Sequence, residues 1–447
     1  MAGIFKAYDV RGTVPDQIDE HVAESMGRAT ALHLGVKRMA VGRDMRASGV
    51  GLSRALIRGI TSVGCDVVDV GVVSTPMQYF ACGSLGVDGG VQVTASHNPA
   101  AYNGFKVSGP SVVPIGGDSG LADIEKMVRA NVAAPAGVKP GKVETADIKA
   151  AYAQKIVGMV RPGARRLKVA IDCGNGMGGL EVEHVLRKLP IDIVGIYLEP
   201  DGTFPNHEAN PLNPKNMEDL QALVLKEKCD LGIAFDGDAD RACFCDEKAG
   251  LVGNDIVTAL LARELVANEP GAAVVYDLRS SRVVPQTISA LGGKPIRERV
   301  GHAYMKRTLR AAKGPYGGEL SGHFYFRDLW YTDSGVYAAA LVMAQLSRGT
   351  QPFSAHLADL RKYPTTGEVN FEVEDKDGLI ERIAAAFKDA RQDRLDGITI
   401  EYPNWWCNVR KSNTEPLLRL VMEADDAASF GAAKAKLMAI LGTPSAH

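Results

Sequence analysis

The chain has 447 residues, of which 46% are hydrophobic and 23% are charged, the balance of a globular protein large enough for several domains. A formal net charge of −2 excludes a general attraction to nucleic acid or to an anionic membrane, and no apolar run approaches membrane-spanning length. The opening residues MAGIFK show no signal-peptide pattern, and the seven cysteines lack zinc or CxxC spacing. We therefore expect reduced thiols, a cytoplasmic location, and neither nucleic-acid nor membrane partners.

Strands and helices alternate through most of the chain. The first block is predicted to contain helices and strands in alternation, with the last strand leading into residues 94–99. A Pro- and Gly-rich linker is predicted at 131–141. The expected elements of this block are helices over 19–33, 51–63 and 121–130, and strands over 38–44, 66–70 and 89–93.

The same order of elements returns twice. Three strands and their helices lead into residues 236–241, and a third set leads into residues 317–323. Because ligands of α/β units sit beyond the ends of the strands, the polar loops of three such blocks can converge on one cleft. We interpret the pattern as an internal triplication. The expected strands are 167–171, 191–197, 231–235, 272–276 and 294–300.

The remaining residues follow a different pattern, with strands over 366–373, 397–401, 405–410 and 417–422 and a helix over 377–390. We expect a separate, mobile α+β domain here, with its boundary near Tyr363 and Pro364. The predicted fold class is therefore α/β, with three similar α/β domains plus a C-terminal α+β domain around a central cleft. The expected domains span residues 1–138, 139–247, 248–362 and 363–447.

Thr94–Pro99 (TASHNP) follows the strand over 89–93, and it is bounded by turn-forming residues. The hydroxyl of Ser96 is thus expected at the end of a strand, beside an imidazole (His97) and an amide (Asn98). A nucleophilic serine fits this arrangement, and so does an ordinary serine-containing turn.

Asp236, Asp238 and Asp240 alternate through a tight loop. Three carboxylates in five residues repel one another unless a cation neutralises them, so the spacing favours a Mg²⁺ site. An EF-hand does not fit, because its sixth position is Arg241 rather than glycine and strands flank the loop. A solvated acidic turn is the alternative.

Two further loops have the composition of ligand-binding segments. Gly317–His323 places Glu319 and Ser321 two residues apart on one side, which suits the vicinal hydroxyls of a sugar, or a solvated strand end. Arg410–Pro416 combines a guanidinium, an ammonium, hydroxyls and an amide, with Arg419 on the next strand. This composition suits a phosphate site or an ordinary surface turn. The glycines of residues 172–179 do not have the dinucleotide-binding spacing, and the chain contains no P-loop motif.

Taken together, the four loops resemble the α-D-phosphohexomutase superfamily, and within it the bacterial phosphomannomutase/phosphoglucomutase group. Residues 94–99 resemble the family's phosphoserine loop, 236–241 its metal loop, 318–323 its sugar loop and 410–414 its phosphate loop. The resemblance covers the whole chain and preserves the family's motif order.

The resemblance implies that Ser96 carries a phosphoryl group, and that Ser96 joins Asp236, Asp238 and Asp240 around Mg²⁺. Lys106, His302 and His323 are the implied acid/base groups, unranked among themselves. Arg279 stands where the best-studied members are expected to have lysine, and Leu320 where methionine is expected. The other implied catalytic residues are Arg11 and Arg241, and the implied substrate-binding residues are Tyr8, His97, Asn98, Arg279, Gly301, Glu319, Ser321, Arg410, Ser412, Asn413, Thr414 and Arg419.

The implied activity is reversible phosphoryl transfer between C1 and C6 of hexose phosphates, those of mannose and also of glucose, through a hexose 1,6-bisphosphate. Glucose 1,6-bisphosphate would serve as activator and intermediate, and the expected partners are small hexose phosphates. We expect a monomer, with a dimer as the alternative. Competing interpretations are a phosphoglucosamine mutase, a Mg²⁺-dependent sugar phosphatase or kinase, and a non-catalytic sugar-phosphate sensor.

Overall fold

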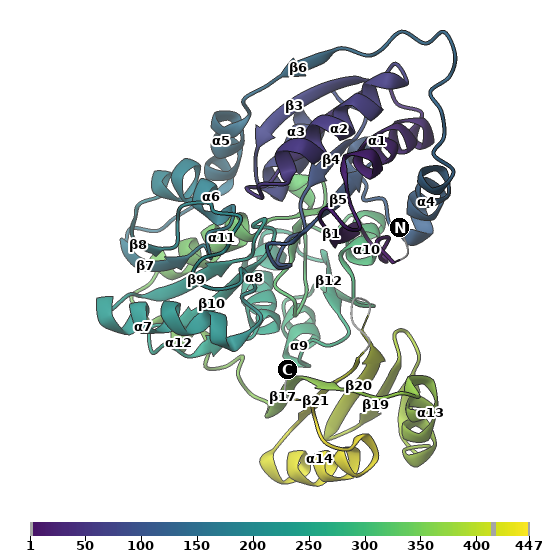
Figure 1. Cartoon of the computed structure of the whole chain (residues 1–447). Coiled ribbons are helices and arrows are strands. Elements are labelled where there is room, and N and C mark those ends of the chain that lie inside the picture. Colours follow the sequence, from purple (N-terminus) through teal and green to yellow (C-terminus); the bar gives the residue numbers. More distant parts are fainter. Residues whose placement is uncertain (1–2, 413–416, 446–447) are drawn as a thin grey trace.

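The computed structural model describes residues 3–412 and 417–445. Four sheets follow one another along the chain, each packed with helices (Figure 1). The first unit and the C-terminal unit lie at opposite ends of the molecule, with the second and third units between them (Figure 1). Within the described residues, no helix is both long and apolar enough to cross a membrane.

The first unit is a six-stranded sheet in the order β1-β5-β4-β2-β3-β6. Its first long helix begins where the Asp19 side chain accepts a hydrogen bond from the backbone N–H of Val22, and it ends at Gly35 in the left-handed conformation. The elements are β1 (Val10–Thr13), α1 (Glu20–Leu34), β2 (Arg38–Arg43), α2 (Gly49–Ser62), β3 (Asp66–Val72), α3 (Thr75–Ser84), β4 (Gly90–Val93), β5 (Tyr102–Ser108), α4 (Ala122–Arg129) and β6 (Val143–Thr145).

The second and third units each contain a five-stranded sheet, in the orders β11-β10-β9-β7-β8 and β13-β12-β14-β15-β16. The second unit contains α5 (Lys149–Met159), β7 (Leu167–Asp172), α6 (Gly178–His184), β8 (Ile191–Ile196), α7 (Glu218–Glu227), β9 (Leu231–Phe235), β10 (Ala242–Asp246) and β11 (Leu251–Val252). The third contains α8 (Asn254–Asn268), β12 (Ala273–Asp277), α9 (Val283–Ala290), β13 (Lys294–Glu298), α10 (His302–Ala312), β14 (Tyr316–Gly318), β15 (Phe324–Phe326), β16 (Thr332–Asp333), α11 (Gly335–Ser347) and α12 (Phe353–Leu357).

One topology occurs in all three of these units. A central strand (β2, β7 or β12) has a parallel neighbour on each side, and the second of these neighbours pairs with an antiparallel strand. The antiparallel pairs are β4 with β5, β9 with β10, and β14 with β15. The loops inside these three pairs are residues 94–101, 236–241 and 319–323. The repeated order confirms the predicted fold class, and it gives the three polar loops equivalent places in their units.

The C-terminal unit is an antiparallel sheet in the order β17-β21-β20-β19-β18, packed with two helices. This arrangement agrees with the expected α+β character. The elements are β17 (Thr365–Phe371), α13 (Lys376–Ala386), β18 (Arg391–Asp393), β19 (Ile398–Tyr402), β20 (Trp405–Lys411), β21 (Leu418–Ala424) and α14 (Ala427–Leu441).

The largest hydrophobic core is shared by the first three units rather than divided among them. Buried side chains of α3, including Met77 and Phe80, pack in one cluster with Tyr152 of α5 and with Val336 and Tyr337 of α11. The C-terminal unit has a core of its own, formed by residues of its sheet and of α13 and α14. Burial of a common core holds the three loop-bearing units together, which fixes the geometry of a site built between them.

Two sheets extend beyond the expected domain ends. Strand β6 lies past residue 138 and yet pairs with β3 of the first sheet. Strand β11 lies past residue 247 and pairs with β10 of the second sheet. In both cases the chain adds one short edge strand beyond the expected boundary, so the sheets end at Thr145 and Val252.

Candidate active site

Ser96 lies at the end of β4 in a buried loop, and its backbone has a left-handed φ of 51°. Residues other than glycine adopt this conformation only where the surroundings impose it. The backbone N–H of Ser96 donates to Thr94 Oγ1 at 2.9 Å. On the other side, a Cβ on Gly237 would come within 2.3 Å of the Ser96 carbonyl oxygen, so glycine is needed there for the second unit to approach this loop.

The loop that contains Ser96 (residues 94–101) and the acidic loop (residues 236–241) meet directly. Ser96 Oγ donates a 2.8 Å hydrogen bond to Asp236 Oδ2, and it lies 3.3 Å from His97 Nδ1. Asp236, Asp238 and Asp240 are all buried, and one oxygen of each lies within 4.8 Å of the others. The loop between β9 and β10 therefore places a cluster of three carboxylates beside Ser96, and Asp236 contacts its hydroxyl.

Lys106, on β5, reaches the acidic loop. Its ammonium lies 2.6 Å from Asp238 Oδ2 and 2.5 Å from Asp240 Oδ2. Burial disfavours the charged amine, but Asp238 and Asp240 outweigh this effect and raise the pKa of Lys106 above its usual value. The side chain is consequently a fixed positive charge in this structure.

The acidic loop fits a divalent cation. Burial, Asp240 and Asp238 together raise the pKa of Asp236 to about 8, because three buried carboxylates are not balanced by the nearby cationic side chains alone. Asp238 Oδ1 is buried and accepts no hydrogen bond from the described residues. Clustered carboxylate oxygens of this kind are the ligands that Mg²⁺ and similar hard cations prefer.

Arg241, His302 and His323 border the acidic loop. Arg241 Nε lies 3.6 Å from Asp236 Oδ2 and 3.3 Å from His323 Nε2. The rings of His302 and His323 are 6.1 Å apart. Arg241 comes from the second unit, and the two histidines come from the third.

The two histidines differ in charge. Burial, and then the nearby Lys306, lower the pKa of His302 well below its usual value, and neither ring nitrogen has a hydrogen-bond partner among the described residues. Burial also disfavours the protonated form of His323, but Asp240 and Glu319 outweigh it and raise its pKa to about 9. These shifts favour the neutral form of His302 and the protonated form of His323.

The loop that contains Glu319 and Ser321 lies between β14 and β15. Glu319 Oε1 accepts a hydrogen bond from the backbone N–H of Gly301 at 3.1 Å, and Glu319 Oε2 accepts one from Ser321 Oγ at 2.6 Å. Ser321 Oγ also lies 2.9 Å from His323 Nδ1. Glu319 and Ser321 thus share one face of the loop, as the two-residue spacing predicts, and their hydrogen-bonding atoms adjoin His323.

Three arginines from two units converge on Glu368 of β17. Arg279 Nη1 and Arg410 Nη2 each donate to Glu368 Oε2 at 2.9 Å, and Arg419 Nη1 donates to Glu368 Oε1 at 3.1 Å. Arg279 also holds both oxygens of Asp277. Burial favours the neutral carboxyl, but the three arginines outweigh it and lower the pKa of Glu368 to about 2. A guanidinium at 279 makes contacts that a lysine ammonium cannot reproduce in this geometry.

Tyr8, Gly301 and Arg11 lie next to His302 and Asn98. Tyr8 donates to the carbonyl of Val300 at 2.9 Å, and its ring lies 5.2 Å from that of His302. Gly301 has φ 137°, and a Cβ there would lie 2.2 Å from the Tyr8 hydroxyl. Arg11 donates to Asn98 Oδ1 at 2.7 Å.

Every site residue predicted from the sequence that lies in the described part of the chain is thus in or beside these loops, with two qualifications. Ser412 follows β20, and its backbone N–H donates to the carbonyl of Leu417. Asn413 and Thr414 lie outside the described residues.

Some residues at the site carry no signal in the sequence. Thr75 begins α3 and donates to Asp238 Oδ2 at 2.5 Å. Asp333 is fully buried beside Asp240 and His323 and is paired with Lys306 at 3.1 Å. Glu368 sits in an ordinary-looking strand. Each of these residues reaches the site from a segment that contains no recognisable motif, so only the tertiary structure identifies them.

Comparison with known proteins agrees with this geometry. Four successive segments match the domains of one family, described as phosphoglucomutase/phosphomannomutase: residues 2–134 match its alpha/beta/alpha domain I, 150–250 domain II, 253–363 domain III, and 368–440 the C-terminal domain. A phosphomannomutase of Escherichia coli is 36% identical over 449 residues, 98% of each chain. A protein named phosphohexose mutases from Xanthomonas campestris is 38% identical over 423 residues, 94% of each chain.

A solved structure of a phosphoglucomutase/phosphomannomutase family protein from Burkholderia thailandensis is 34% identical, with a TM-score of 0.89. The match covers 99% of this chain and 98% of that one. Fold and relatives together define the class of protein, an enzyme of the phosphohexomutase type. The chain belongs to the phosphoglucomutase/phosphomannomutase family.

Proposed function

We propose that this enzyme interconverts the 1- and 6-phosphates of mannose and of glucose, with Ser96 as the phosphoryl carrier and Mg²⁺ as the metal. The observation that carries the proposal is the 2.8 Å contact between Ser96 Oγ and Asp236 inside a buried acidic triad. A hydroxyl used only for structure would not need a neighbouring cluster of three buried carboxylates, with one oxygen of each within 4.8 Å of the others. The names of the relatives support the same chemistry.

In the proposed first step, the bond between phosphorus and Ser96 Oγ breaks, and a bond to the free hydroxyl of a hexose monophosphate forms. The hydroxyl gives its proton to a base, Ser96 Oγ takes up a proton as it leaves phosphorus, and the product is a hexose 1,6-bisphosphate. The bisphosphate then reverses its orientation in the cleft, and its other phosphate is transferred to Ser96 by the reverse step. Glucose 1,6-bisphosphate would therefore both prime Ser96 and serve as an intermediate.

The charges of the site suggest how the residues divide this work. Neutral His302 is suited to accept the hydroxyl proton, whereas protonated His323 is suited to donate one. Lys106 and Arg241 would offset the charge on the transferring phosphoryl group. When bound, Mg²⁺ on the three aspartates would supply further charge stabilisation. Arg11, His97 and Asn98 would shape the wall beside Ser96.

Glu319 and Ser321 are proposed to bind the O3 and O4 hydroxyls of the sugar. The configuration at C2 is then not recognised, so that mannose and glucose phosphates are both accepted. Tyr8 and Gly301 would line the entrance. The non-transferred phosphate would be held by the arginines that converge on Glu368, with the loop after β20. The proposed phosphate-binding residues are Arg279, Arg410, Ser412, Asn413, Thr414 and Arg419.

The test is product analysis with mannose, glucose and glucosamine 1-phosphates, each with and without a catalytic amount of glucose 1,6-bisphosphate. We expect mannose and glucose 6-phosphates, formed faster with the bisphosphate, and little inorganic phosphate. Stoichiometric release of inorganic phosphate would instead identify a phosphatase. Binding without turnover would identify a sensor, and a preference for the glucosamine phosphate would identify a phosphoglucosamine mutase.

A further inference from the structure

We propose that Arg46 is a positioning residue that holds the loop of Ser96 in its reactive conformation. The inference rests on the proposed function, because it concerns how Ser96 is presented for phosphoryl transfer. Arg46 lies between β2 and α2, far from the acidic loop in sequence, and it reaches Ser96 and Asn98 through their backbone carbonyls rather than through their side chains. Its side chain is 1% exposed.

The Arg46 guanidinium donates to four backbone carbonyls, three in the loop of Ser96 and one at the first residue of β5. Nη2 donates to the carbonyl oxygens of Ser96 at 2.9 Å and Asn98 at 2.5 Å. Nη1 donates to those of Pro99 at 2.7 Å and Tyr102 at 2.9 Å. The Ser96 carbonyl is buried outside regular structure and must find a donor elsewhere, and the guanidinium fork donates to it and to the three part-buried carbonyls. The loop consequently closes around one side chain.

The same group of residues controls the backbone of Ser96 from both sides. Asp44 Oδ2 lies 3.3 Å from Arg46 Nε and accepts a 2.7 Å hydrogen bond from Thr94 Oγ1. Thr94 Oγ1 in turn accepts from the N–H of Ser96. Thus the N–H and the carbonyl of Ser96 are both tied to the Asp44–Arg46 pair. This double restraint accounts for the left-handed φ of Ser96, a conformation that residues other than glycine rarely adopt unless the surroundings enforce it.

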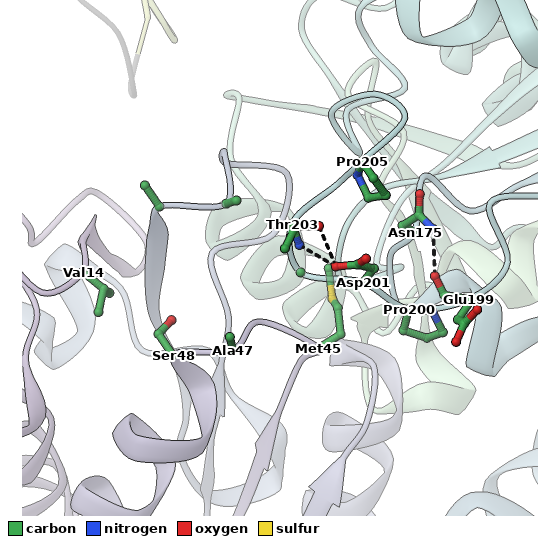
Figure 2. A pocket seen from close by; sticks show the side chains of 13 residues that line it. Val14, Met45, Ala47, Ser48, Asn175, Glu199, Pro200, Asp201, Thr203 and Pro205 are labelled. Atoms are coloured by element: carbon green, nitrogen blue, oxygen red, sulfur yellow. Dashed lines mark hydrogen bonds between the residues drawn. The ribbon is translucent and has the colours of Figure 1, made fainter.

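The second unit completes the arrangement. The ring of Phe204 lies 5.0 Å from the Arg46 guanidinium, and a Cβ on Gly202 would come within 2.7 Å of the Arg46 Cα. A pocket of about 700 Å³ opens beside this contact, lined by Met45 and Ala47 on either side of Arg46 and by Asp201 and Thr203 of the second unit (Figure 2). The unit that supplies Asp236 thus also packs against the residue that holds Ser96.

The consequence is specific to one step. A loop that is displaced by about 1 Å loses roughly a hundredfold in rate, although sugar and phosphate contacts made by other units are untouched. Lysine keeps the charge at position 46, but its ammonium has three donors on one nitrogen and cannot span four carbonyls. Arg46→Lys should therefore lower kcat about a hundredfold and leave the KM for mannose 1-phosphate unchanged.

The experiment compares Arg46→Lys and Arg46→Ala with Arg58→Ala, a control at an arginine on the exposed face of α2 that pairs with Glu20 and Glu24. Three quantities are measured: kcat and KM, the rate at which glucose 1,6-bisphosphate adds a phosphoryl mass to the protein, and Mg²⁺ binding by calorimetry. We expect the phosphorylation rate to fall in parallel with kcat in the Arg46 variants, with Mg²⁺ affinity unchanged. Free guanidinium, added below the concentration that lowers Tm, should restore part of the activity of Arg46→Ala only.

A folded Arg46→Lys protein with wild-type kcat and phosphorylation rate overturns the inference and leaves the proposed function intact. Parallel changes in KM, Mg²⁺ affinity and Tm, without rescue, would show general unfolding and also overturn it. If Arg46→Ala does not fold, Arg46→Lys alone decides between these outcomes. Failure of the proposed function is recognised separately, by a Ser96→Ala protein that retains full activity.

Discussion

Ser96 Oγ and Asp236 Oδ2 are 2.8 Å apart, although 140 residues separate them in the chain. Both lie in loops that join the same two strands of a repeated topology, β4 to β5 in the first unit and β9 to β10 in the second. Repetition of the unit therefore provides two equivalent loops, and the shared core brings them face to face. The chemistry arises between units, since neither loop contains both the hydroxyl and the carboxylates.

Thr75 should tune metal binding. Its hydroxyl donates to Asp238 Oδ2 at 2.5 Å, and its backbone N–H donates to the Asp238 carbonyl at 3.1 Å. Groups that orient a metal ligand typically change affinity ten- to a hundredfold when removed. Thr75→Val should thus weaken Mg²⁺ binding by about tenfold in calorimetry on the unphosphorylated protein, whereas Thr75→Ser should bind nearly as the wild type does. Equal affinity of the valine variant would contradict this role.

Glu368 should oppose phosphate binding. The carboxylate neutralises part of the charge of Arg279, Arg410 and Arg419, so its removal leaves a stronger positive field for a dianion. Glu368→Gln should lower the Kd for inorganic phosphate by on the order of tenfold, with most of this gain lost at high salt. Glu372→Gln, an equal charge change at an exposed position after the same strand, is the matched control. Weaker binding by Glu368→Gln would mean that the carboxylate is needed to hold the arginines in place.

Glu181 should make stability depend on pH. It is buried where the first two units meet, accepting hydrogen bonds from Ser74 and Tyr152. Burial raises its pKa from 4.5 to about 8, so the folded protein keeps a proton there that the unfolded chain releases. This contribution to stability is complete below pH 4.5 and is lost as the pH rises through about 8.

The variant Glu181→Gln keeps the shape and removes the titration. Its free energy of unfolding should rise relative to that of the wild type by roughly 1.4 kcal/mol per pH unit as the pH increases from 5 to 8, and its Tm should rise with it. The difference should level off above about 8. Thermal unfolding across this pH range measures the difference directly. A Tm difference that is independent of pH would show that Glu181 is ionised in the folded protein.

The sequence was sufficient for the fold class and for the loops, because each loop follows a predicted strand, carries closely spaced polar residues, and resembles a motif of one family in the family's order. Ser96, Asp236, Glu319 and Arg410 are recognisable for that reason. The residues that contact these loops are not recognisable from the sequence. Arg46, Thr75 and Glu368 lie in segments whose local pattern does not differ from that of an ordinary strand or helix. Their roles depend on which residues the tertiary fold brings against them.

The core shared by the first three units could not be predicted from local sequence patterns either. Residues of α3 are buried on nearly every side, which in the sequence resembles any short apolar helix. Only the structure reveals that α3 packs against α5 and α11 rather than within its own unit alone. Similarly, the edge strands β6 and β11 are too short to have a recognisable period, so the sheets extend past the expected domain ends at 138 and 247.

The central claim is that Ser96 carries the phosphoryl group, and one measurement tests it most directly. The protein is incubated with glucose 1,6-bisphosphate, the peptide containing Ser96 is analysed by mass spectrometry, and the labelled protein is then chased with mannose 1-phosphate. We predict one phosphate on Ser96 that disappears in the chase as a hexose bisphosphate forms, and neither label nor turnover in Ser96→Ala. A phosphate on another residue, or a Ser96→Ala protein with wild-type turnover, would contradict the account.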